Sequence, residues 1–368
     1  MRPKKQDNKG QLQISFNWIF VLIVGAIILL FFITSLTKET DSSKTQLAQK
    51  ASARLDAVFA VIQQNPDSVQ IHDAPNYELD FYCTEEGHYY ALKDSSTKNY
   101  LENEHIFAPE TIGKAKLVSW TKTFSAPFPV SSILYLSDEK NQYVFITADP
   151  KIEKLYEDFP DKFSKKNVTS SQDIIDEGFR KYIIITDALP VASNINNEVR
   201  KKTQAIIVVS SETASDVYGY GNLKYYEEGS STSINKPYVG QELLFAGIVS
   251  GNSELYSCGL SKVLEKTKIV AQTNLLRTQA LKDQYDLTYT GRCSTFYGLV
   301  TQGYIQNLTE SASNFETSDT TKNYKKFYDS MTDLQRVNEN ILRSDCTLLY
   351  WIRLNNIWIN NWDWLNWI

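Results

Sequence analysis

Residues 14–36 form an uninterrupted apolar segment of 23 positions without a charged side chain. At about 1.5 Å per residue, a helix of this length crosses a bilayer core of roughly 30 Å. The segment is therefore predicted to be a transmembrane helix in contact with the lipid bilayer. Whatever the remaining chain does, it is expected to do at a membrane surface.

The charges that flank this segment predict its orientation. Residues 1–13 carry four basic side chains and one acidic side chain, a net charge of +3, whereas the charges directly after residue 36 cancel. Because basic flanks stay on the cytoplasmic side, we expect a single-pass protein of the cell membrane with a cytoplasmic N-terminus and an ectodomain outside. A cleaved secretory signal is the competing interpretation, but it has a shorter apolar core and a small-residue cleavage site, which this sequence lacks after Leu36.

The residues in front of the apolar segment resemble a known class of export signal. Lys9-Gly10-Gln11, a short polar step and then an apolar helix are similar to the class III signal of archaeal type IV pilin-like proteins. The resemblance implies cleavage between Gly10 and Gln11 and assembly into a surface filament through the N-terminal helix. That class usually has Glu at the fifth mature position, where this chain has Ser15, so an ordinary signal anchor stays open as the alternative.

A second resemblance covers residues 107–136. This run is similar to uncharacterised archaeal single-pass proteins with the same layout, and it implies no activity. The chain is acidic, with a formal net charge of −5, and the exported part is more acidic still because the N-terminal flank is basic. An acidic ectodomain argues against a nucleic-acid partner.

Four cysteines lie in the predicted ectodomain, and an even number in an exported region predicts two disulfides. We expect one bridge within the group Cys258, Cys293 and Cys346, with Cys83 paired to the remaining member. No C-x-x-C pair is present, so a zinc knuckle is not expected. The sequence also has two N-glycosylation sequons, which begin at Asn167 and Asn307.

The predicted fold class is α+β. After a cytoplasmic segment (residues 1–13) and the transmembrane helix, residues 37–65 have apolar positions at steps of three and four, which predicts an amphipathic helix continuous with the anchor. Residues 66–250 are expected to form an α/β ectodomain with a small, mostly parallel sheet. Residues 251–350 are expected to form a disulfide-containing helical bundle, and residues 351–368 are a Trp-rich tail.

Periodicity assigns elements within the ectodomain. Continuous apolar runs at residues 132–136, 143–147, 181–186 and 205–210 predict strands buried on both faces. Helices are predicted from Asp149-Pro150 onward and over residues 171–180, 241–249, 257–283, 293–308 and 324–342. In the tail, Trp351, Trp358 and Trp362 fall on one face of a helix, which favours a membrane interface or a partner groove. A tail packed on its own domain is the alternative.

Signals for chemistry are sparse. Asp149 and Asp187 follow predicted strands, and Ser210 and Ser211 end the next one, so an acid–hydroxyl cluster at the carboxyl ends of the sheet is conceivable. These residue types also cap helices routinely. His72, His88 and His105 show no metal-ligand spacing, and neither a nucleophile elbow nor a Walker loop is present. We therefore predict no catalytic residue, cofactor or metal.

From these observations we expect a membrane-anchored extracytoplasmic protein that acts as a non-catalytic binding or surface-structure module. A pilin-like filament subunit that associates with itself or with other surface proteins is the alternative. An extracytoplasmic enzyme with a site at the strand ends is a more distant one.

Overall fold

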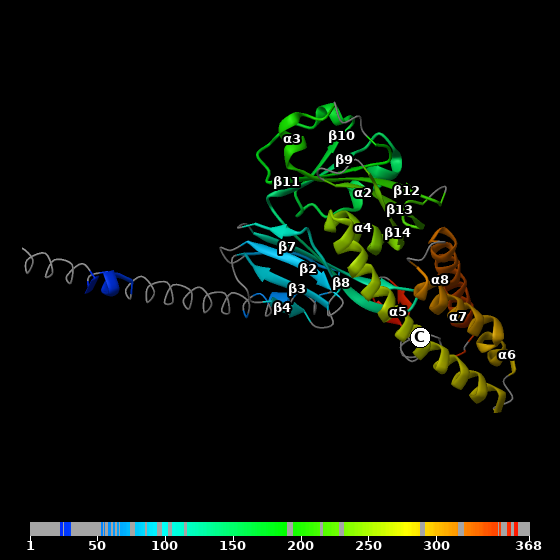
Figure 1. Cartoon of the computed structure of the whole chain (residues 1–368). Helices are drawn as coiled ribbons and strands as arrows, with labels where there is room; N and C mark the ends of the chain where they lie inside the picture. Colours follow the sequence, from blue (N-terminus) through cyan, green and yellow to red (C-terminus); the bar gives the residue numbers. More distant parts are fainter. Residues whose placement is uncertain are drawn as a thin grey trace, which may run out of the picture.

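The protein is described by a computed structural model (Figure 1). It describes residues 23–24, 26–30, 53, 55, 58–59, 62, 65, 67–73, 78–84, 87–93, 98–101, 105–113, 116–189, 194–213, 216–227, 232–287, 291–315, 320–344, 346, 352–354 and 357–359. Most of the predicted transmembrane segment lies outside these residues. Its described part, residues 23–24 and 26–30, is helical with exposed apolar side chains such as Ile27 and Leu29. Within the described residues, no helix is long and apolar enough to cross a membrane.

The N-terminal lobe consists of two four-stranded sheets. One has the order β1 (Val69–His72), β7 (Leu117–Ser125), β8 (Pro129–Asp138) and β5 (His105–Phe107). The other has the order β4 (Lys98–Leu101), β3 (Gly87–Leu92), β2 (Leu79–Thr84) and β6 (Thr111–Ile112). Alternate residues of β2 are buried, and side chains of both sheets share one apolar core. Leu55, Phe59 and Ile62 from the predicted juxtamembrane helix belong to that core and are at most 2% exposed.

The α/β lobe is built on a six-stranded sheet. Its order is β10 (Lys165–Val168), β9 (Asn141–Ile146), β11 (Lys181–Thr186), β12 (Thr203–Ser211), β13 (Tyr220–Glu227) and β14 (Ile234–Val239). β10, β9, β11 and β12 are parallel to one another, whereas β13 and β14 are added antiparallel. α2 (Pro150–Asp158) and α3 (Asn197–Lys202) connect the parallel strands.

The apolar runs of β9 and β11 follow from burial on both faces of this sheet. Tyr143 and Phe145 point into the main core together with side chains of α2, while Val144 and Ile146 point into a separate core with Val199 of α3. A strand covered on both faces has no solvated positions, so its sequence does not alternate.

Helices from residue 240 onward connect the lobes to a helical end (Figure 1). α4 (Gly240–Ser250) starts at Gly240 with φ 79° and ends at Gly251 with φ 55°, a left-handed position that favours glycine. α5 (Ser253–Leu287) then packs on β5, β8 and β2 and continues along α7 (Leu299–Ser313), which contacts α8 (Thr320–Leu342). The short α6 (Gly291–Ser294) and a 3₁₀ turn (Thr295–Tyr297) precede α7.

Two disulfides join segments that are distant in sequence. Cys83 of β2 is bonded to Cys258 of α5, with Cα atoms 5.9 Å apart, and Cys293 of α6 is bonded to Cys346 after α8, with Cα atoms 5.7 Å apart. The predicted pairing scheme is confirmed, as is the mixed α+β class. His88 lies beside the first bridge, its Nε2 3.5 Å from the Cys83 Sγ, and burial with nearby His105 and Lys262 lowers its pKa to about 4.

Several predicted elements differ from the structure. The helix expected over residues 171–180 is only a 3₁₀ turn, Ser171–Asp173. The Asp176 side chain accepts hydrogen bonds from the Gly178 N–H and the Tyr182 hydroxyl, and such local bonds compete with helical ones. Gly178 then adopts φ 84°. The helix expected over residues 293–308 is interrupted at Gly298, whose backbone is extended.

The tail is also different from its prediction. The helical interpretation of residues 351–368 is wrong where the structure describes them, because Ile352–Leu354 (β15) and Ile357–Ile359 (β16) form an antiparallel pair. The sequence places two Asn residues between two short apolar runs, a combination that favours a hairpin. Trp358 lies on β16, whereas Trp351 and Trp362 lie outside the described residues.

Removing either disulfide by paired Cys→Ser substitution is expected to lower the free energy of unfolding by about 2–5 kcal/mol. The Cys83–Cys258 bridge closes a separation of 175 residues and the Cys293–Cys346 bridge one of 53, so loop-closure entropy predicts that loss of the first costs about 1 kcal/mol more. Reversible denaturant unfolding of the two double variants measures this. A larger cost for the second bridge would show that the entropy of the unfolded chain does not set their relative contributions.

Candidate functional site

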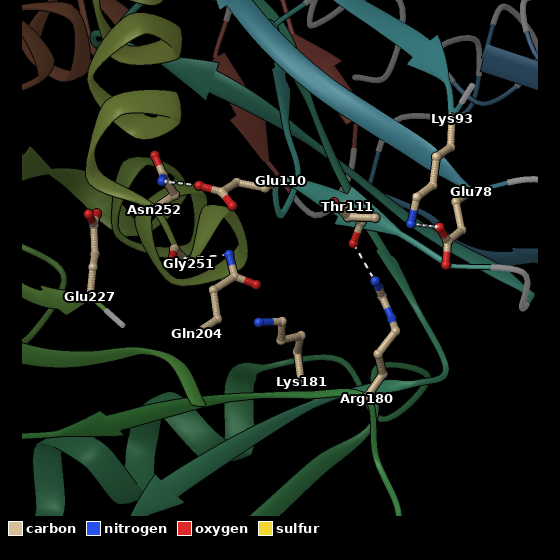
Figure 2. Close-up of a pocket in the computed structure, with 10 residues that line it drawn as sticks. All are labelled: Glu78, Lys93, Glu110, Thr111, Arg180, Lys181, Gln204, Glu227, Gly251 and Asn252. Atoms are coloured by element: carbon tan, nitrogen blue, oxygen red, sulfur yellow. Dashed lines mark hydrogen bonds and ion pairs between the residues drawn. The ribbon is translucent and has the colours of Figure 1, made fainter. Parts of the chain in front are cut away.

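A cavity of about 470 Å³ lies at the junction of the two lobes (Figure 2). We call it the inter-lobe cavity. Its volume falls within the range of small-molecule sites, which occur preferentially where domains meet. Its walls are polar and come from both lobes and from the α4–α5 junction. The lining residues are Glu78, Lys93, Glu110, Thr111, Arg180, Lys181, Gln204, Glu227, Gly251 and Asn252.

Arg180 ties the two lobes together at one side of this cavity. It directly precedes β11, and one of its guanidinium nitrogens donates to the Thr111 carbonyl and to the Asp138 carboxylate, each at 2.7 Å. The same nitrogen lies 3.1 Å from the Asn141 Oδ1. Asp138 is fully buried and also accepts from the Gly113 N–H at 2.6 Å, so its charge is compensated at the lobe boundary.

Two glutamates on the opposite side bond to neutral donors. Glu110 accepts from the Asn252 side-chain amide at 2.6 Å, and Glu227, at the end of β13, accepts from the Ser253 N–H at 2.7 Å. By contrast, Glu78 forms an ion pair with Lys93. Figure 2 shows Lys181 pointing between these two sides, toward Gln204. Glu110 and Glu227 thus both line the cavity, and the hydrogen-bond donors described above for their carboxylates are neutral groups.

A second, smaller cavity lies at the carboxyl ends of the parallel strands. This strand-end cavity has a volume of about 190 Å³ and is lined by Asp149, Asp187, Ser210 and Ser211, with Lys151, Ile152, Val209 and Val217. The structure therefore brings together the acid–hydroxyl cluster conceived from sequence. The strand order places this cavity at the ends of β9 and β11, where the chain leaves the sheet toward opposite faces. Ligands of open α/β sheets usually bind at such a point.

The side chains at the strand ends are engaged in local structure. The Asp149 carboxylate accepts from the Lys151 N–H at 2.6 Å and caps α2, as the alternative interpretation of this residue predicted. The Ser211 hydroxyl lies 2.9 Å from the Asp216 carbonyl and bonds to Thr213 in the following turn. The Asp149 carboxylate and the Ser211 hydroxyl are therefore used for local structure, and these contacts do not orient either group toward a ligand.

Other predicted residues are distributed over the surface and core. Asn167 is exposed on the edge strand β10, whereas Asn307 is half-buried on α7. His72 contacts the Ser119 hydroxyl at 3.0 Å, and burial lowers its pKa, while His88 and His105 are buried. Among the described residues, no three His, Cys, Asp or Glu side chains gather to hold a metal ion. Gly10 and Gln11 lie outside the described residues.

The inter-lobe cavity was not predicted from sequence. Its residues are spread from position 78 to position 252 and sit at strand and helix ends, where no motif marks them. The only local signal is the Arg180-Lys181 pair in front of an apolar strand. Comparison with known proteins does not supply the missing information: no family model, curated protein or solved structure matches this chain.

Replacing Arg180 by Met is expected to lower the free energy of unfolding by about 3 kcal/mol, because it leaves the buried Asp138 carboxylate without its cation. The matched control is Lys201→Met, which removes an exposed ion pair with Glu198 and is expected to cost less than about 1 kcal/mol. Denaturant unfolding of both variants measures the difference. Equal costs would mean that the Arg180–Asp138 pair does not hold the lobes together.

Proposed function

We propose that this protein is a single-pass, membrane-anchored extracytoplasmic binding protein whose inter-lobe cavity takes a small, amine-bearing polar ligand. The observation that carries the proposal is the cavity itself, a polar space of ligand size between two lobes. The proposed anchor is residues 14–36, with the N-terminus in the cytoplasm. The two disulfides support an oxidising location for the ectodomain.

The charge arrangement supports a ligand that carries an ammonium group. Glu110 and Glu227 keep neutral hydrogen-bond partners, whereas Glu78 is neutralised by Lys93 and Arg180 by Asp138. A ligand ammonium placed between Glu110 and Glu227 gains charge-assisted hydrogen bonds there. Free amino acids and short peptides carry such an ammonium group.

Binding without catalysis is the proposed role. The inter-lobe residues make bonds that position the lobes, and in the strand-end cavity Asp149 caps α2 and Ser211 shapes a turn. An enzyme that uses Asp149 and Asp187 would need the Asp149 carboxylate released from that cap toward a substrate. The observed contacts favour a binding module over that alternative.

The test uses the full-length protein in a non-ionic detergent and isothermal titration with alanine, glutamine and diglycine. We expect heat from at least one of them and none from its Nα-acetylated form, because acetylation removes the ammonium charge. The paired substitution of Glu110 and Glu227 by Gln keeps the hydrogen-bond acceptors and is expected to weaken binding at least tenfold. Glu78→Gln is the matched control with a small expected effect. Absence of heat for every compound, or equal binding by the variant, would contradict the proposal.

A pilin-like filament subunit is the second candidate function. The observation that supports it is the burial of the helical residues Leu55, Phe59 and Ile62 in the core of the N-terminal lobe. Such a helix, half in lipid and half packed on its domain, is the arrangement that the resemblance at Lys9-Gly10-Gln11 implies. The alternative is a stalk helix that packs on its own ectodomain.

The N-terminal peptide of the protein purified from its native membrane separates these two candidates. A signal anchor predicts a chain that keeps Met1 or lacks only that residue. A chain that begins at Gln11 would instead show processing after Gly10 and make filament assembly the leading function. Mass spectrometry of the intact protein and of its N-terminal peptide gives this answer directly.

A further inference from the structure

A row of three tyrosines crosses the outer face of the sheet β4-β3-β2-β6. Because side chains alternate along a strand, Leu79 and Phe81 of β2 point into the core while Tyr82 points outward. Tyr82 is paired directly with Tyr89 of β3, and Tyr89 is paired directly with Tyr100 of β4. The three rings therefore lie side by side on one face, and the row that they form runs across the strands.

The rings support one another. Tyr82 and Tyr89 are stacked with centroids 4.9 Å apart and planes 16° apart, and Tyr89 and Tyr100 have centroids 5.4 Å apart. The Lys98 ammonium lies 5.0 Å from the Tyr89 centroid. Tyr82 and Tyr100 are 42% and 43% exposed, whereas the central Tyr89 is 9% exposed. The row is thus a pre-ordered aromatic surface with two accessible ends, so a ligand that contacts it has few side-chain rotamers to fix.

Around the row, the described part of this face is polar. The Thr111 hydroxyl donates to the Asp80 carboxylate at 2.9 Å, next to the rings. Strand register and alternation assign the following described residues to this face: Asp80, Tyr82, Thr84, Gly87, Tyr89, Ala91, Lys98, Tyr100 and Thr111. None of these is Val, Leu, Ile, Met or Phe, and one acid and one base balance the charge.

We infer that this tyrosine row binds an oligosaccharide. The C–H face of a sugar ring packs on an aromatic ring, while its hydroxyls bond to tyrosine hydroxyls and to groups such as Asp80, Lys98 and Thr111. A protein partner is less well served, because the centres of protein interfaces combine aromatic anchors with methionine and arginine side chains, and the described part of this face has neither. The inference does not depend on the inter-lobe cavity or on the membrane anchor.

Affinity electrophoresis tests the inference with the full chain in a non-ionic detergent. Native gels contain one soluble polysaccharide each: mannan, xylan, hydroxyethylcellulose, dextran, alginate or hyaluronate. At least one is expected to retard the protein. Tyr82→Ala and Tyr100→Ala are expected to weaken that retardation about tenfold, while the Phe variants keep most of it because the rings remain. Tyr226→Ala, on β13 of the other lobe, is the control and is expected to behave like the unaltered protein.

A second measurement avoids variants that fail to fold. Nitration by tetranitromethane, followed by peptide mass analysis, reports the accessibility of each tyrosine in the unaltered protein. The retarding polysaccharide is expected to protect Tyr82 and Tyr100 but not Tyr226. Retardation by none of the polysaccharides, equal retardation of the Ala variants, or absence of protection would each overturn the inference. So would protection by a membrane-protein fraction when no polysaccharide protects.

Discussion

The structure depends on the burial of one helix between its parts. In α4, eight of eleven residues are buried, and its side chains join one apolar core that also contains residues of both lobes and of α7 and α8. The ring centroid of Phe245 lies 5.1 Å from that of Trp120 in the N-terminal lobe. It lies 5.8 Å from the ring centroid of Phe159, which follows α2 of the α/β lobe. A helix that is apolar all round is stable only when surrounded in this way, so neither lobe can be removed without exposing it.

Tyrosines allow this helix to be surrounded without leaving polar groups unpaired. Tyr135 of the N-terminal lobe donates to the Glu242 carbonyl at 2.9 Å, and Tyr225 of the other lobe donates to the Gly247 carbonyl at 3.0 Å. Burial raises the pKa of both phenols, which therefore stay neutral donors. At Gly247 a Cβ would clash with the Leu223 side chain, so the lack of a side chain at this position allows the helix to lie close to β13. The sequence has 22 tyrosines, and those buried around this helix thus serve packing.

Local sequence patterns predicted most of the helices and strands in the α/β lobe and the helical end. Features that depend on contacts between distant parts of the sequence could not be predicted. Runs at residues 143–147, 181–186 and 205–210 are adjacent strands because burial on both faces leaves a readable apolar run. The even cysteine count predicted two disulfides, and two are present. The strand-end cluster was predictable since each member follows a strand closely in sequence. The inter-lobe cavity was not, because Glu110 and Asn252 meet only after α4 has brought the lobes together. The prediction of a helix over residues 171–180 was wrong for a local reason. Hydrogen bonds from the Gly178 N–H and the Tyr182 hydroxyl to the Asp176 side chain compete there with helical hydrogen bonds.

One strand connects the features to which we assign function. β2 begins directly after Glu78 of the inter-lobe cavity, carries Tyr82 on its outer face, and is bonded through Cys83 to α5. α5 begins one residue after Asn252, which lines the same cavity and bonds to Glu110. The disulfide therefore closes a covalent loop through the wall of the cavity and the strand that bears the tyrosine row. Because this bond constrains the unfolded chain, it favours the folded state in which the cavity wall and the tyrosine row are both assembled.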